Sequence, residues 1–263
     1  SLSQSYSRKD SWNAQMRLEW KPDTLTNIMF RPSMSFSTSD GRSVNNMAQF
    51  NDDPYTYVSD PLSDASISEL AQRGAMVNTN RSSSISYDNT KTLGGMLQLN
   101  RKLNSKGRNV TLRADVDYTD TQNKGLSVSN VHLYQVKDQT GMDSTYQTNR
   151  YNITPSRKWS YSLQTTYSEP LWRATFLQFS YRFNYSYTRS DRSTYDFSNL
   201  GESLFAGLTP AYRSWDNYLE RLDNPYESYL DKALSRYSEY KNYTHNIEMM
   251  FRMIRQKYQF NAG

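Results

Sequence analysis

Strict two-residue alternation is the feature that most constrains this chain. From Leu177 to Thr188 an apolar or aromatic side chain occupies every second position, and only polar side chains stand between them. Because successive side chains of a strand point to opposite faces, the pattern predicts a β-strand with one apolar face. Similar alternation predicts eight strands in all, near residues 10–21, 27–39, 82–101, 108–121, 147–168, 173–190, 241–254 and 257–263.

The connections between these strands alternate in length. Short ones fall at 22–26, 102–107, 169–172 and 255–257, and long ones near 40–81, 121–147 and 190–241. In an up-and-down antiparallel sheet, this order collects the short turns at one end and the long loops at the other. Bacterial outer-membrane barrels have tight periplasmic turns and long extracellular loops. We therefore predict an all-β fold, an antiparallel up-and-down transmembrane β-barrel, with residues 1–263 as part of one barrel domain.

The composition favours a folded chain. The apolar face of the strands could contact either protein, as in a soluble sheet, or lipid. The mean hydropathy is −0.89, yet 14% of the residues are aromatic, which argues against disorder. A solvated sheet also alternates, so a soluble all-β binding module stays an alternative. Apolar sets that span about ten residues, with aromatic side chains such as Trp159 and Tyr167 at strand ends, favour lipid and a bacterial outer-membrane location.

Charge and cysteine content exclude several classes of function. The net charge of +5 is spread along the chain without a block of one sign, so the sequence shows no footprint for nucleic acid. The absence of cysteine excludes disulfides and thiolate metal sites.

Two short helices are predicted inside the long loops. In "SDASISELAQRG", Ser66 and Glu69 have the spacing of a capping box and Gly74 is placed as a C-cap. A second helix in "YLDKALSRYSEY" would carry one apolar face for packing on its neighbours, made of Leu230, Ala233, Leu234 and Tyr237.

Three segments resemble the barrel of TonB-dependent outer-membrane receptors. They are "TLGGMLQLNRKLNSKGRNVTLRADVDYTDTQ", "WSYSLQTTYSEPLWRATFLQFSYRFNYSYTRSDR" and "NYTHNIEMMFRMIRQKYQFNAG". The resemblance extends from about Trp12 onward, and its most specific part is the "YSEPL" turn with the strand that follows. It implies uptake of a nutrient solute, and it implies outer-membrane lipid, a plug domain elsewhere in the parent chain, a TonB-type energising complex and a surface lipoprotein as partners. A barrel that binds at the cell surface without transporting anything stays an alternative.

The resemblance also implies a larger barrel than eight strands can form, because such receptors have about 22 strands. Eight strands are enough for the smallest closed barrels. The last predicted strand, however, has only about seven residues, fewer than the roughly 9–11 of a full span. Residues 1–10 are polar and are expected to be the tail of a preceding loop. We expect a fragment of a larger barrel, with a complete small barrel as the alternative.

The sequence offers little for catalysis, metals or cofactors. His132 and His245 are the only histidines and neither has a second ligand at a suitable spacing, so we predict no enzyme, no metal site and no cofactor. In "FNDDPYTYVSD", a calcium site at Asp52, Asp53 and Asp60 is weighed against a plain turn, which we favour.

Other polar and aromatic motifs also receive no assigned role. The aromatic loop 210–229 suits either a sugar or peptide ligand or simple loop packing, and the ligand-binding residues stay unknown. We interpret the glycosylation-type sequons as chance occurrences, at Asn80, Asn109, Asn152, Asn184 and Asn242.

Overall fold

The computed structural model describes residues 1–205, 217–255 and 258–262, and it forms one antiparallel β-sheet with a few short helices. The sheet order is β1-β3-β4-β5-β6-β7-β8-β9, and β2 also pairs with β3. The predicted all-β, up-and-down antiparallel fold is therefore confirmed, and the open sheet is consistent with a sector of a barrel. The strands are β1 (Leu2–Gln15), β2 (Leu18–Trp20), β3 (Thr26–Phe50), β4 (Met76–Lys102), β5 (Asn109–Lys137), β6 (Asp143–Trp172), β7 (Thr175–Asp196), β8 (Leu230–Arg255) and β9 (Tyr258–Ala262).

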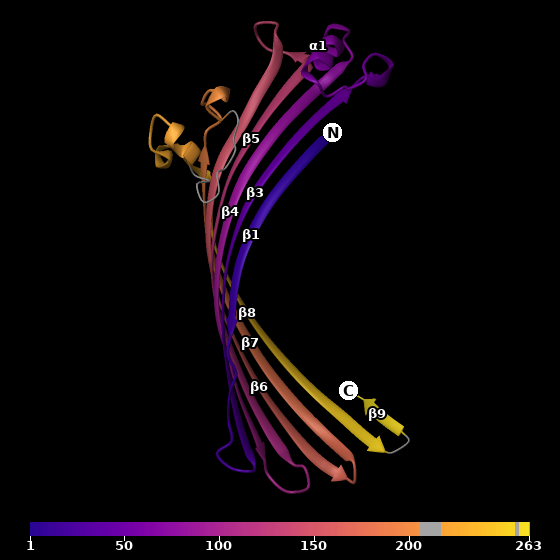
Figure 1. Cartoon of the computed structure of the whole chain (residues 1–263), viewed down its shortest axis with the longest axis vertical. Coiled ribbons are helices and arrows are strands. Elements are labelled where there is room, and N and C mark those ends of the chain that lie inside the picture. The colour runs from indigo at the N-terminus through magenta and orange to yellow at the C-terminus, as the bar shows by residue number, and fades with distance from the viewer. Residues whose placement is uncertain (206–216, 256–257, 263) are drawn as a thin grey trace.

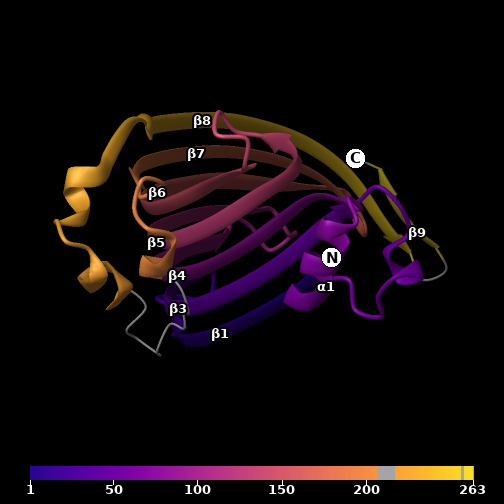
Figure 2. The same ribbon diagram turned by 90° about the horizontal axis from the view of Figure 1, so that it is seen from above.

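The sheet is tall and bowed along its strands (Figure 1). Viewed from above, it is an open arc that runs from β1 to β8 (Figure 2). The helix α1 (Asp64–Gln72) and the short 3-10 helix η1 (Pro54–Thr56) lie at the upper end. The turns between β2 and β3, β4 and β5, and β6 and β7 lie at the lower end. Three further 3-10 helices flank the convex side, namely η2 (Glu202–Phe205), η3 (Asn217–Arg221) and η4 (Tyr226–Tyr229).

The strands are much longer than predicted, and this corrects the predicted loops. β4, β5 and β6 hold 27, 29 and 30 residues, which corresponds to roughly 90–100 Å at about 3.3 Å per residue. The predicted loop 121–147 is wrong, since β5 and β6 continue to a turn at 138–142. The predicted loops 40–81 and 190–241 shrink to 51–75 and 197–229, and residues 2–10 belong to β1 rather than to a loop.

The physical reason is that the upper strands do not need an apolar period to pair. The register of β4 on β5 continues without a shift from Lys102 opposite Asn109 to Asn78 opposite Leu133. Side chains there are polar on both faces over long stretches, so the alternation that marks the lower strands fades. The backbone ladder extends the sheet there, and apolar packing is confined to two small clusters.

The helix predicted in "YLDKALSRYSEY" (229–240) is also wrong, because β8 begins at Leu230. β7 extends to Asp196 and offers a free edge, so Tyr195 pairs with Leu230. A register shift follows, where the Asp231 carboxylate accepts hydrogen bonds from the backbone N–H groups of Ala233 and Leu234 at 2.8 and 3.1 Å. Long-range pairing overrides the helical pattern of the side chains.

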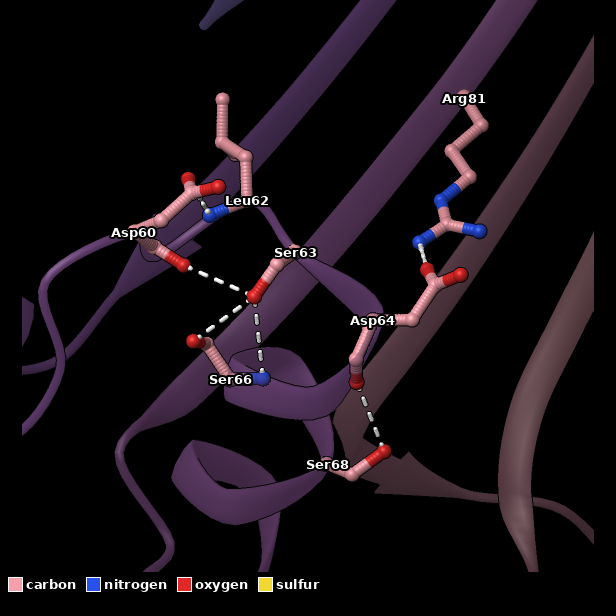
Figure 3. Close-up of polar contacts among 7 residues, drawn as sticks. All are labelled: Asp60, Leu62, Ser63, Asp64, Ser66, Ser68 and Arg81. Atoms are coloured by element: carbon pink, nitrogen blue, oxygen red, sulfur yellow. Dashed lines mark hydrogen bonds and ion pairs between the residues drawn. The ribbon is translucent and has the colours of Figure 1, made fainter.

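The helix predicted near Ser66 is present as α1, with a different N-cap. The Ser63 hydroxyl accepts from the Ser66 backbone N–H at 3.3 Å and donates to the Asp60 carbonyl at 3.1 Å (Figure 3). Gly74 follows the helix with φ of 73°, a left-handed conformation that suits glycine. Buried Ile67 and Leu70 dock α1 on the ends of β3, β4 and β5. No helix in the described part of the chain is long and apolar enough to cross a membrane.

A second buried cluster joins the upper sheet to residues within 197–205 and 219–229. Tyr151 lies at its centre, with the Phe197 ring 6.5 Å away and the Tyr226 ring edge-on at 5.7 Å. The sheet residues of this cluster belong to the same alternating set as the apolar residues lower in their strands. Because η2, η3 and η4 lie on the convex side (Figure 1), that alternating set faces the convex side.

Candidate functional site

The convex face of the lower sheet carries a continuous apolar belt. The strand register brings the apolar sets into line, so that Phe183 of β7 lies opposite Leu163 of β6 and His245 of β8. On β3 and on β5 to β8 the belt is about nine to eleven residues high, the length of a tilted strand that crosses a bilayer core, and on β4 it extends from Leu93 to Leu99. Its members include Leu18, Trp20, Ile28, Phe30, Met34, Leu93, Leu97, Leu112, Val116, Tyr161, Leu163, Phe179, Tyr181, Phe183, Ile247 and Met249.

Most of these belt residues are exposed although they are apolar, and only Ile28 and Phe183 among those named are partly buried. Leu97 is 50% exposed, Leu163 is 56% exposed and Ile247 is 82% exposed. Water-soluble monomers rarely expose one contiguous apolar patch of more than a few hundred Å². A surface of this kind fits contact with lipid better than contact with water.

Aromatic side chains mark the rims of the belt. At the upper rim, the Tyr118 and Trp159 rings lie 4.2 Å apart between centroids, and Trp12 and Phe36 lie 5.8 Å apart. Trp20 stands near the lower end. Amphipathic rings prefer the interface between lipid and water. On β4 to β8 the same face becomes charged directly above the belt, with Lys91, Asp120, Arg157, Arg189 and Glu239 in one row across the strands. This row continues to Phe36 of β3 and Trp12 of β1.

The concave face at the same height is polar and hydrogen-bonded across strands. The Thr92 and Thr119 hydroxyl oxygens lie 3.3 Å apart, and the Arg182 guanidinium donates to the Gln164 side-chain oxygen at 2.7 Å. A polar face behind a lipid-type face is typical of a barrel lumen.

This concave wall contains one small niche of about 190 Å³, which extends across β5 to β8. Asp117 lies at the niche, with its carboxylate over Gly94 of the neighbouring strand. A Cβ atom at Gly94 would lie 2.3 Å from an Asp117 carboxylate oxygen, so glycine makes room for this acid. The other lining groups are mostly hydroxyl and amide, which suits a polar solute.

A larger cavity of about 550 Å³ lies between α1 and the upper ends of β4, β5 and β6. His132 lines it, with its Nε2 atom 3.0 Å from Asp143 and its ring stacked on Tyr134 at 4.0 Å. Lys137 also pairs with Asp143, and together the hydrogen bonds from Lys137 and His132 hold the pKa of the Asp143 carboxyl below its usual range.

The position of His132 in this cavity differs from the one that the sequence predicts. His132 falls within the predicted loop 121–147, but it lies in β5 and its ring pairs with Asp143. No local spacing reveals this partner, because the pair depends on the turn at 138–142. An ion pair between Arg81 of β4 and Asp64 of α1 closes another side of the cavity (Figure 3).

The remaining sequence candidates have structural roles. His245 lies on the belt face, where its Nδ1 atom is 2.9 Å from the Tyr181 hydroxyl. Asp53 accepts from the Tyr55 backbone N–H at 3.1 Å and Asp60 from that of Leu62, as turn residues do. Within the described ranges, no group of three or more histidine or acidic side chains has an arrangement that could hold a metal ion.

The sequon asparagines and the described part of the aromatic loop 210–229 also have structural roles. Four of the five sequon residues lie inside strands, and the fifth begins β5. Asn80 accepts from the Ser129 hydroxyl at 3.1 Å, and Asn152 accepts from the Thr194 hydroxyl at 2.7 Å. Tyr226 and Tyr229 of the aromatic loop pack on the cluster around Tyr151, while residues 210–216 lie outside the described part of the chain.

Taken together, the fold and the belt define an open sector of antiparallel sheet with one lipid-type face and one polar face. No family model matches the chain, and no curated protein matches it. Among solved structures, the chain is similar to the RagAB peptide importer in its closed-closed state, with 10% sequence identity and a TM-score of 0.29. That match covers 97% of this chain and 35% of the other, so this chain spans about a third of its length. A likeness of this size carries no argument about function.

Proposed function

We propose that the chain is a sector of a bacterial outer-membrane β-barrel of the TonB-dependent receptor type, which imports a nutrient solute. The observation that carries the proposal is the exposed apolar belt on the convex face, whose height matches a bilayer core and which is backed by a polar face. Lipid on one side and a watery lumen on the other account for both faces.

The open edges of the sheet support a larger barrel. In lipid, unpaired backbone N–H and C=O groups cost several kcal/mol each, so only closed barrels span as strands. β1 and β9 stand at the two ends of the strand order. Further strands of the parent protein would pair with these edges and close the barrel.

Transport is the function that the concave face supports best. Its hydroxyl, amide and charged side chains, such as Arg182 and Asp117, form a wall for a polar solute. As proposed partners, a plug domain elsewhere in the parent chain would block the lumen and a TonB-type complex would supply energy. A surface lipoprotein would assist capture, and the solute itself is unidentified.

A barrel that binds a partner at the cell surface without transport is the second candidate. The observation in its favour is the height of the strands above the belt. His132 stands twelve residues above Asp120 on β5, which is roughly 40 Å. The cavity between α1 and the sheet would then lie far outside the membrane and be open to a partner.

The first test is fractionation of cells that express the whole parent protein. We expect recovery in the outer-membrane fraction, with a mobility on gels that changes when the sample is boiled. Recovery in the soluble fraction would contradict both barrel candidates. Transport is tested separately, by comparing uptake of offered peptides and oligosaccharides in cells with and without an active energising complex.

A further inference from the structure

Two like charges stand opposite each other just above the upper rim of the belt. Arg157 of β6 and Arg189 of β7 are direct partners in the register, one pleat above Trp159 and Tyr187. Both belong to the outward-facing alternating set. Like charges directly opposite in an antiparallel pair destabilise a sheet. An anion between the two guanidinium groups would turn this repulsion into attraction.

The acidic neighbours neutralise this pair only in part. Asp120 lies 3.8 Å from Arg157, at the outer limit of an ion pair, and the Arg157 side chain is 65% exposed. Glu239 lies opposite Arg189 in the register, but its carboxylate accepts from the Tyr187 hydroxyl at 3.0 Å and also from that of Tyr237. Glu239 keeps its charge near Arg189 and Lys241, and the two tyrosines engage only one of its oxygen atoms. Two carboxylates, Asp120 and Glu239, therefore stand against the three cations Arg157, Arg189 and Lys241, which leaves a net positive charge.

Aromatic stacking holds the cations in place. The Arg189 guanidinium lies 5.2 Å from the centre of the Tyr237 ring, and the Lys241 ammonium lies 5.8 Å from that of Tyr187. A guanidinium stacked on a ring keeps its in-plane N–H donors available, and their geometry matches two oxygens of a phosphate.

We propose that Arg157 and Arg189 form a seat for the phosphate group of an anionic membrane lipid. This inference rests on the proposed function, because only a belt that lies in lipid places the pair at headgroup height. Lipid phosphates are the anions concentrated at that height, and basic residues beside an anionic surface are attracted to it. Lys241 on the neighbouring strand β8 adds a third cation on the same face, next to Arg189.

The experiment measures how lipid charge affects the stability of the whole parent protein. The protein is reconstituted in bilayers of phosphatidylcholine alone and of phosphatidylcholine with phosphatidylglycerol, and its unfolding is followed by the heat-dependent gel shift. The test variant carries Arg157→Gln with Arg189→Gln. The matched control is Arg182→Gln, on the concave face of β7. A further arm adds inorganic phosphate to phosphatidylcholine bilayers.

We expect the anionic lipid to raise the ratio of folded to unfolded protein by roughly fivefold per arginine. The control variant should keep this gain, the double variant should lose it, and inorganic phosphate should not replace the lipid. Three results would contradict the phosphate site and leave the proposed function intact. The double variant could keep the full gain, the wild-type protein could fold equally well in both bilayers, or inorganic phosphate could give an equal gain. A wild-type protein that folds in neither bilayer overturns the proposed function and the seat together.

Discussion

Within β5 and β6, the residues inside the belt alternate between apolar and polar, whereas those above it are polar on both faces over long stretches. The lower half of each strand has its apolar side chains exposed, as with Leu163 and Val116. The upper half instead buries a few aromatic and aliphatic residues under residues within 197–205 and 219–229 and under α1. The same strands therefore carry two kinds of surface, an exposed apolar face in the lower half and small buried clusters in the upper half.

The largest effect is expected from a buried aromatic residue of the upper half. Tyr151 is 1% exposed and packs against Phe197 and Tyr226. Tyr151→Ala should destabilise the upper sheet by about 3–5 kcal/mol, because it leaves a cavity in a small core. Hydrogen exchange of β6 and β7 above the belt measures this loss.

The matched control for Tyr151 is Tyr161→Ala, ten positions along the same strand and on the same face. Tyr161 lies in the belt and is 41% exposed, so its truncation should cost much less than that of a buried residue. Equal losses at the two positions would mean that the belt is covered by protein in the assembled barrel, and the comparison between the halves would fail.

A charge placed in the belt should have the next largest effect. Phe183→Arg puts a cation near the middle of the lipid-type face and should cost about 2–4 kcal/mol in a bilayer. Asn184→Arg is the neighbouring change on the concave face and should be nearly silent, since that face is polar. Folding into bilayers, followed by the heat-dependent gel shift, separates them, and similar damage from both would argue against lipid on the convex face.

How much the sequence could predict differs between the halves for the same reason. The belt strands follow from alternation, because a strand with one apolar face carries an apolar side chain at every second position. The pairing of residues 121–137 with residues 143–156 leaves only a short pattern of this kind, at Leu126, Val128 and Tyr151, and most of the other side chains there are polar on both faces. The start of β8 at Leu230 is also hidden, because it depends on the free edge of β7 rather than on its own residues.

Some site residues could be predicted from local spacing, and others depend on contacts that the sequence does not reveal. The belt face of Phe179, Tyr181 and Phe183 could be predicted from spacing alone. The pair of His132 and Asp143 could not, because it exists only once the turn at 138–142 closes the β5–β6 hairpin. By contrast, α1 was predictable as a helix because its capping signals are local.

A smaller effect is expected where the two faces meet at consecutive glycines. Gly94 faces the concave side, and a Cβ there would lie 2.3 Å from Asp117 and 2.9 Å from Ser33. Gly94→Ala should cost about 1–3 kcal/mol, because both side chains must shift. Gly95→Ala faces the belt, where its Cβ would meet Phe30 at an ordinary 3.6 Å, so this control should be neutral in thermal unfolding. A harmless Gly94→Ala would show that the concave wall is loosely packed.

The smallest effect should come from the exposed ion pair at the upper tip. Hydrogen bonds from Lys137 and His132 lower the pKa of Asp143. A lowered carboxyl pKa contributes stability above the ordinary value of about 3.9, and this contribution is lost as the pH falls through the lowered value. Asp143→Asn should therefore loosen the turn at 138–142 at about pH 5 and leave it unchanged well below the lowered pKa. Hydrogen exchange of that turn, corrected for its intrinsic pH dependence, measures the difference, with the lower turn at 103–108 as internal control. If the loosening persists at low pH, the Asp143 side chain stabilises the turn through its shape and hydrogen bonds rather than through its negative charge.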